Sequence, residues 1–186
     1  MEQVVAGRQL YAMPNLITLS RVGVGVLVPF VWYWSPSLVV ALVLWAGISD
    51  FLDGWTARQW NSRTPLGVVG DPLADKLFVA PVLCIVAIAY GGVVLWALCI
   101  LTVLYDIDNT YRRRIEIIAA FQGRYAAQSR PVTWLSKGKT AVLFGFLFLV
   151  TLAPWFPQLD VHTIALVPLC LVGLSWWQSR KSTFFP

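Results

Sequence analysis

Long apolar blocks, separated by short turn sequences and one polar stretch, dominate the pattern of this chain. The apolar blocks cover residues 22–34, 38–49, 77–98, 93–105, 141–153 and 163–177. Turns are indicated by Gly91-Gly92 between the third and fourth helices, by WSPS at 34–37 and by APWFPQLD at 153–160. The pattern therefore predicts six helices, with the polar segment 106–139 between the fourth and the fifth.

The composition is that of a membrane protein. The chain of 186 residues is 58% hydrophobic and only 12% charged, whereas about a quarter of the residues of a soluble domain are charged. We expect one all-α integral membrane domain over residues 1–186, with an amphipathic N-terminal segment at about 1–14. The N-terminus lacks the pattern of a cleaved secretory signal, and the three cysteines lie in apolar runs, where a disulfide framework is not expected. Tryptophans that flank the blocks, such as Trp176, are typical of the membrane interface.

The basic residues predict the orientation in the membrane. With six spanning helices and an inner N-terminus, all fourteen Lys and Arg fall on one side of the bilayer. Basic residues collect on the cytoplasmic side. Both termini are therefore expected in the cytoplasm, and no nucleic-acid partner is expected.

Several apolar blocks are too short to span a bilayer alone. Blocks 22–34, 38–49 and 141–153 have about 12–13 residues, or roughly 18–20 Å of helix, against the ~30 Å of hydrocarbon. Each helix must therefore include polar neighbours, and these all lie toward the cytoplasmic end. This predicts a polar cavity in the cytoplasmic half of the bundle.

Four aspartates are concentrated where the second and third helices approach that end. Asp50 and Asp53 share one helix face, and Asp71 and Asp75 share another. Pro65 and Gly67 are expected in a tight reversal that brings these acids together. Clustered carboxylates are typical ligands of Mg²⁺ or Mn²⁺, and four of them favour a two-metal site. The alternative is that they are caps or solvated loop residues, and Asp71 before Pro72 is typical of an N-cap.

The spacing of these residues resembles a known family signature. Asp50-x2-Asp53-Gly54-x2-Ala57-Arg58, eight residues, then Gly67-x3-Asp71-x3-Asp75 is similar to the signature of the CDP-alcohol phosphotransferases. MPNLITLSR at 13–21 resembles their entry helix. WLSKGKT at 134–140 resembles a segment of the bacterial phosphatidylglycerophosphate synthases, to which the chain is most similar.

The resemblance implies transfer of a phosphatidyl group from CDP-diacylglycerol to an alcohol, with release of CMP. It implies that Asp50, Asp53, Asp71 and Asp75 bind the metals and that Asp75 is also the catalytic base. It further implies that the CDP donor is bound by Gly54, Ala57, Arg58 and Gly67. A homodimer in the bacterial inner membrane is the implied state.

Basic residues near the aspartates predict a phosphorylated acceptor such as glycerol 3-phosphate. Arg21 lies on the first helix within the expected cavity, and Lys137 and Lys139 lie at the mouth of the fifth. The alternative for the lysines is that they snorkel to anionic headgroups.

One dipeptide departs from the family pattern. Where the phosphatidylglycerophosphate synthases carry Arg-Glu and the cardiolipin synthases Arg-Asp, this chain has Tyr105-Asp106. We include both residues in the expected acceptor site, with Arg112 as a compensating cation. Asp108 is expected to pair with nearby arginines in a structural role.

Other functions remain open at this point. Within the family, the acceptor could instead be phosphatidylglycerol, as in cardiolipin synthesis, or an inositol phosphate or other polar alcohol. Outside it, a divalent-cation transporter would use the aspartates for permeation, but it would also need polar residues in the outer halves of several helices. A catalytically inactive membrane scaffold is disfavoured by the complete signature.

Overall fold

The structure is a computed structural model, which describes residues 13–59, 65–112 and 134–184. Within these ranges it describes the side chains of residues 18–49, 52, 73–112 and 138–180. The expected N-terminal segment at about 1–14 lies almost wholly outside them.

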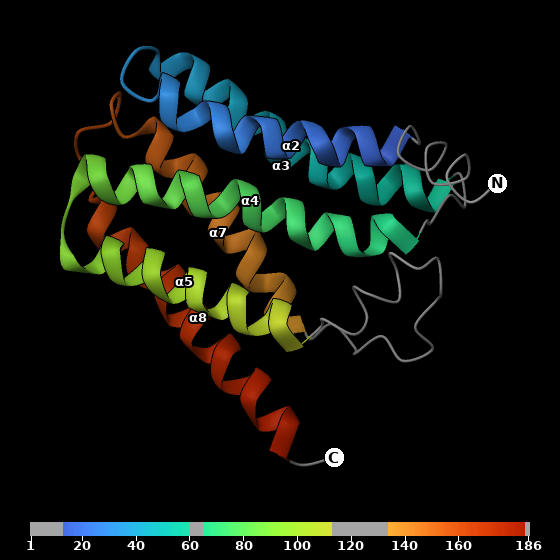
Figure 1. Ribbon diagram of the computed structural model, residues 1–186. Coiled ribbons are helices and arrows are strands. Elements are labelled where there is room, and N and C mark those ends of the chain that lie inside the picture. Colours follow the sequence, from blue (N-terminus) through green and yellow to red (C-terminus); the bar gives the residue numbers. More distant parts are fainter. Residues whose placement is uncertain (1–12, 60–64, 113–133, 185–186) are drawn as a thin grey trace.

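Six helices make up the described chain, as the hydropathy pattern predicts. They are α2 (Met13–Val31), α3 (Pro36–Gln59), α4 (Pro65–Tyr90), α5 (Val93–Arg112), α7 (Trp134–Leu152) and α8 (Val161–Phe184). Successive helices run in opposite directions along the bundle (Figure 1). The start of α2, α4 and α7 and the end of α3, α5 and α8 therefore lie at the same end, which we call the polar end. The connections 32–35, 91–92 and 153–160 lie at the opposite end, which we call the turn end.

The helices pack in two groups around a shared apolar core. α2 packs against α3 and α4, while α5 packs against α4 and α8, and α7 contacts α3, α4 and α8. The rings of Phe78 on α4 and Phe144 on α7 stack with their centroids 5.2 Å apart. α4 and α7 thus join the two groups at the centre of the bundle.

A glycine permits the close approach of α2 and α4. A methyl group added at Gly25 would lie 2.6 Å from the carbonyl oxygen of Leu77 and 2.7 Å from Cα of Phe78. Gly23, two residues earlier, has nothing within 4 Å of the equivalent position. Only hydrogen at Gly25 lets the two backbones meet, which sets the register of α2 on α4.

The hairpin between α4 and α5 turns at Gly91-Gly92, as predicted. Both residues have positive φ angles, 66° and 82°. A residue with a side chain would be strained in this conformation, whereas glycine adopts it readily. His162 packs on this turn, since a methyl group at Gly92 would lie 2.5 Å from its Cε1 atom. The hairpin is thereby fastened to the start of α8.

Asp160 caps the start of α8 at the turn end. Its carboxylate accepts hydrogen bonds from the Thr163 hydroxyl at 2.5 Å and from the backbone N–H of His162 at 3.1 Å. These bonds stabilise the ionised form, with the Thr163 hydroxyl contributing most, and they hold the pKa of Asp160 below its ordinary value.

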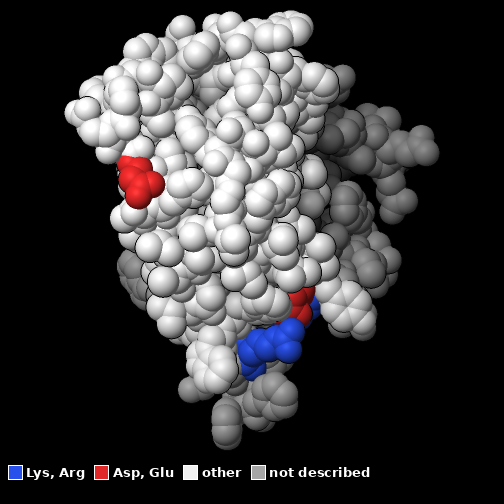
Figure 2. Space-filling view, turned by 90° about the vertical axis from the view of Figure 1, so that its left-hand side faces the viewer, with Lys and Arg blue, Asp and Glu red and all other residues white. Residues whose placement is uncertain are grey.

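The outer surface of the bundle is apolar. Large hydrophobic side chains such as Phe30, Ile88, Val93 and Val167 are more than half exposed, which favours lipid rather than water around them. The view onto the turn end shows a surface that is almost free of charge, apart from one acidic patch and a charged group at its lower margin (Figure 2).

Within the described residues, three helical segments are long and apolar enough to span a membrane: Leu73–Tyr90, Val93–Arg112 and Val161–Arg180. The apolar parts of the other helices are shorter, Thr18–Val31, Pro36–Ser49 and Gly138–Leu152. As expected, these helices continue into polar sequence, and in every case at the polar end. Together with the apolar surface, this indicates an integral membrane protein.

One expectation about the start of α4 is wrong, and the alternative role considered for Asp71 does not hold either. The helix begins at Pro65, so Pro65 and Gly67 belong to its first turn rather than to the reversal. Asp71 is therefore inside the helix and is not its N-cap. The physical reason is that proline suits the first helical position, where its missing N–H would have no partner in any case.

Candidate active site

The four aspartates of the signature lie on two helices that meet at the polar end. Asp50 and Asp53 belong to the last part of α3, and Asp71 and Asp75 to the first half of α4. Both helices pack against α2, which brings their polar segments to the same level of the bundle (Figure 1). Asp75 is the one of the four whose side chain falls in the described part of the chain.

Arg21 is the polar centre of this region. It is 0% exposed and is among the largest fully buried side chains described. Its guanidinium donates a hydrogen bond from Nη1 to Oδ1 of Asp75, with which it forms an ion pair, and another from Nε to the Ser49 hydroxyl at 3.2 Å. Ser49 in turn donates to the carbonyl oxygen of Ala46 at 2.8 Å.

This arrangement holds three helices together through one side chain. Arg21 comes from α2, Ser49 from α3 and Asp75 from α4. A buried guanidinium needs both an anion and further acceptors to offset its desolvation. The contacts of Arg21 with Asp75 and Ser49 meet that need. They also mean that the Asp75 carboxylate is covered by the guanidinium on the side that faces α2.

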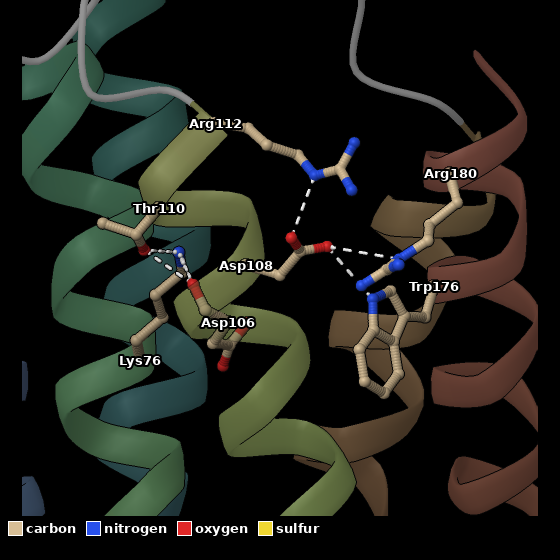
Figure 3. A network of polar contacts seen from close by, with 7 residues as sticks. All are labelled: Lys76, Asp106, Asp108, Thr110, Arg112, Trp176 and Arg180. Carbon is tan, nitrogen blue, oxygen red and sulfur yellow. Dashed lines mark hydrogen bonds and ion pairs between the residues drawn. The ribbon is translucent and has the colours of Figure 1, made fainter. Parts of the chain in front are cut away.

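Lys76, the residue after Asp75, connects α4 to α5. Its ammonium donates to the backbone carbonyl oxygen of Asp106 at 3.1 Å and to the Thr110 hydroxyl at 2.5 Å. The same hydroxyl donates to the Asp106 carbonyl at 2.7 Å. The left half of Figure 3 shows this group of contacts at the end of α5.

The side chain of Asp106 turns to α7. Its Oδ1 atom lies 3.5 Å from Nζ of Lys139, and the same ammonium lies 3.9 Å from the centroid of the Tyr105 ring. Lys139 is 6% exposed. The alternative that this lysine snorkels to headgroups does not hold for Lys139, because its ammonium is enclosed between α5 and α7.

Asp108 joins α5 to α8, as its expected structural role requires. Its carboxylate accepts from Nε of Arg112 at 3.1 Å and from the indole N–H of Trp176 at 3.0 Å, and it lies 4.0 Å from Nε of Arg180 (Figure 3). Arg180 also lies over the Trp176 ring. Arg112, an expected acceptor residue, thus pairs with Asp108 one helical turn earlier in α5.

Several expected site residues are placed only by their backbone. Gly54, Ala57 and Arg58 lie on the last turns of α3, Gly67 lies on the first turn of α4, and Lys137 lies on the first turn of α7. All of these positions are at the polar end. Their side chains, and those of Asp50, Asp53 and Asp71, lie outside the described part of the structure.

Five residues of these networks were not expected at the site: Ser49, Lys76, Thr110, Trp176 and Arg180. Ser49 precedes Asp50 and Lys76 follows Asp75. This adjacency to the signature is the sequence feature that could have indicated a place at the site. Trp176 was expected at the membrane interface, like the other tryptophans that flank the apolar blocks. Nothing in the sequence indicates that it pairs with Asp108.

The donor set at the polar end fits a hard divalent cation. All four acids of the signature offer carboxylate oxygens, which Mg²⁺ and Mn²⁺ prefer, and they lie on two helix segments at one level. Among the described side chains, no group of three His, Cys, Asp or Glu converges elsewhere as an alternative metal site. The cysteines described are not disulfide-bonded.

Comparison with known proteins gives a consistent result. The family model described as CDP-alcohol phosphatidyltransferase matches residues 11–177. A CDP-diacylglycerol–glycerol-3-phosphate 3-phosphatidyltransferase of Pectobacterium atrosepticum is 30% identical over 179 residues, which cover 90% of each chain. A protein of the same name from Yersinia enterocolitica is 29% identical, and the match covers 89% of each chain. Another from Cereibacter sphaeroides is 30% identical, and the match covers 76% of this chain and 65% of the relative.

Proposed function

This chain belongs to the CDP-alcohol phosphatidyltransferase family, and we propose that it transfers the phosphatidyl group of CDP-diacylglycerol to glycerol 3-phosphate, releasing CMP. The observation that carries the proposal is the position of the signature. Its eight residues lie on the two helix segments that meet beside buried Arg21, at the polar end of an otherwise apolar bundle. The names of the relatives support the choice of donor and acceptor.

Asp50, Asp53, Asp71 and Asp75 would hold Mg²⁺ or Mn²⁺, in a site of two ions. Such ions, when bound, neutralise charge on the donor diphosphate and on the departing CMP. Gly54, Ala57 and Gly67 would leave room for the cytidine because they are small. Arg58 would bind the diphosphate through its guanidinium.

Asp75 would accept the proton of the acceptor hydroxyl. The hydroxyl oxygen attacks the phosphorus of the phosphatidyl group, a new P–O bond forms, and the P–O bond to CMP breaks with its electron pair leaving on CMP. Asp75 must be ionised and correctly directed for this role. Arg21 would supply both conditions, since it forms an ion pair with the carboxylate and is itself held by Ser49.

The acceptor would bind on the α5–α7 side of Asp75. Lys76 links Asp75 to the end of α5, where Tyr105, Asp106 and Lys139 meet. Lys137 and Arg112 would add positive charge around this place. Arg21 was expected to bind the acceptor directly, and its contacts with Asp75 favour instead a role in directing the base.

The difference between the polar end and the turn end also supports an orientation in the membrane. We propose that all six helices span the bilayer and that the polar end, with the active site and both termini, faces the cytoplasm of a bacterial inner membrane. This follows from the basic residues described, Arg21, Lys76, Arg112, Lys139 and Arg180, which all lie in the halves of their helices nearest that end. The homodimer that the family resemblance implies remains a prediction.

A divalent-cation transporter is the less favoured alternative. A permeation path would need polar residues through the turn-end half of the bundle. Among the described side chains, that half contains apolar residues around Val28, Val39 and Val86 in its core.

The test is an acceptor panel with purified protein. CMP release from CDP-diacylglycerol should require Mg²⁺ or Mn²⁺ and should be fastest with glycerol 3-phosphate. Phosphatidylglycerol, inositol phosphate and serine are measured side by side with it. A faster reaction with another alcohol would change the acceptor, and no CMP release with any alcohol would overturn the proposal.

A further inference from the structure

The ammonium of Lys139 has unusual surroundings for a buried lysine. It is enclosed by the face of the Tyr105 ring, whose centroid is 3.9 Å away, and by the Asp106 carboxylate at 3.5 Å. A charge-assisted N–H···O bond is ordinarily about 2.7–2.9 Å long. The contact with Asp106 is therefore a loose ion pair rather than a close hydrogen bond.

Lys139 thus retains capacity to donate hydrogen bonds. An ammonium has three N–H donors, and the described contacts of Lys139 are the loose pair with Asp106 and the ring. A ring face attracts the cation without using a particular donor. The lysine is held in position with donors available for an anion.

Contacts also connect this ammonium to the residue that follows the expected base. Lys76 adjoins Asp75 in α4 and bonds the backbone carbonyl of Asp106, the residue that pairs with Lys139. One short chain of contacts therefore leads from Asp75 to Lys139. An acceptor whose hydroxyl lies at Asp75 could place a phosphate a few bonds away toward Lys139.

We propose that Tyr105 is a positioning residue that holds Lys139, by the face of its ring, as the cation that binds the phosphate of the acceptor. This inference rests on the proposed function. The ring retains the lysine and leaves its N–H donors to the acceptor.

The test compares the ring with the hydroxyl of Tyr105. Tyr105→Phe retains the ring and is the comparison for its loss: the KM of this variant for glycerol 3-phosphate should lie well below that of Tyr105→Leu. Tyr105→Leu removes the ring and should raise that KM roughly tenfold, in the range of a desolvated cation–π contact. The difference between the two variants should lie in the KM for glycerol 3-phosphate and not in kcat or in the KM for CDP-diacylglycerol. Tyr105→Met, which is closer to tyrosine in length, is the second ring-free variant in case Tyr105→Leu does not fold.

Two further measurements separate the phosphate from the rest of the acceptor. Inorganic phosphate should compete with glycerol 3-phosphate, and its inhibition constant should rise in Tyr105→Leu by the same factor as the KM. Glycerol, which lacks a phosphate, should show no change in its rate constant kcat/KM between Tyr105→Phe and Tyr105→Leu.

The outcomes distinguish this inference from the proposed function. If the parent enzyme turns over no alcohol, the proposed function fails. If it is active but Tyr105→Phe and Tyr105→Leu have the same KM for glycerol 3-phosphate, the positioning role is wrong. A fall in kcat without a change in KM, or an equal effect on glycerol, would overturn it as well.

Discussion

The helix ends are held together by different interactions at the two ends of this bundle. At the turn end, closure uses backbone conformation and small contacts: the positive φ angles of Gly91 and Gly92, the His162 ring on Gly92, and the Asp160 cap. At the polar end, long charged side chains reach between helices, as Arg21 does to Asp75 and Lys139 to Asp106.

The difference separates stability from activity. A contact within one turn needs no charge to be taken out of water and can be exposed, as Asp160 is. Burying charge at the polar end has a desolvation cost that only well-placed partners offset. A membrane protein that retains such charges therefore has a use for them. We expect substitutions of the buried charged residues at the polar end to change activity or strongly change stability, and substitutions at the turn end to have small effects.

The largest expected effect is on catalysis. Asp75→Asn should lower kcat about 10²–10⁴-fold, the range for loss of a general base, while the protein remains folded in detergent. Asp160→Asn is the matched control, because it neutralises an acid at the turn end and should leave turnover unchanged. CMP release at saturating substrates measures both. Near-normal turnover in Asp75→Asn would remove this residue from the role of base.

The next effect is on folding. Arg21→Met removes a fully buried cation and leaves Asp75 without its guanidinium partner, which should destabilise the protein by about 3–5 kcal/mol. Arg180→Met provides the comparison, since its side chain is 57% exposed and 4.0 Å from Asp108, and should cost no more than about 1 kcal/mol.

Chemical unfolding in detergent measures both variants. The double variant Arg21→Met with Asp75→Asn should lose less than the sum of the two single losses, because the unpaired charge is then removed. Additive losses would mean that the ion pair contributes nothing to stability.

A smaller effect is expected where α2 meets α4. Gly25→Ala should destabilise the protein by about 1–3 kcal/mol, since its methyl group would meet the backbone of Leu77 and Phe78 and push the helices apart. It should also reduce activity, because the register of Arg21 on Asp75 depends on the same contact. Gly23→Ala, with open space around it, should be neutral or slightly stabilising. Equal stabilities of the two variants would contradict the close approach.

The smallest effect is expected at the α8 cap. The folded pKa of Asp160 lies below its unfolded value of about 3.9. Its contribution to stability is therefore present above that value and is lost as the pH falls through the lower folded pKa. Asp160→Ala should lower the Tm slightly at pH 7, and the difference from the parent should shrink below about pH 4. A difference that is constant with pH would exclude the carboxylate as its source.

The sequence predicts the position of a residue along the bundle axis much better than it predicts which side chains that residue contacts. The six helices of the described ranges, the turn at Gly91-Gly92 and the extension of short apolar blocks into polar sequence all follow from hydropathy and bilayer thickness. These predictions are confirmed because each depends on one segment at a time. The start of α4 was misassigned because Pro65 suits a turn and a first helical position equally well.

Partners on other helices could not be predicted, because several charged residues share one level and hydropathy does not say how each helix is rotated. Arg21 meets Asp75 across 54 residues of sequence, and Trp176 meets Asp108 across 68. Lys139 was as compatible with the headgroups as with the interior until its contacts with Tyr105 and Asp106 placed it. Only packing, such as the contact at Gly25, sets those rotations.

The near-absence of charge at the turn end also bears on how the protein enters its membrane. The links at 32–35 and 91–92 are short and contain no Lys, Arg, Asp or Glu. Each ionised side chain carried across the hydrocarbon has a large free-energy cost. The end with the uncharged links is therefore the one that can be moved through the bilayer at least cost. α4 and α5, joined through two glycines, can be inserted together as one helical hairpin.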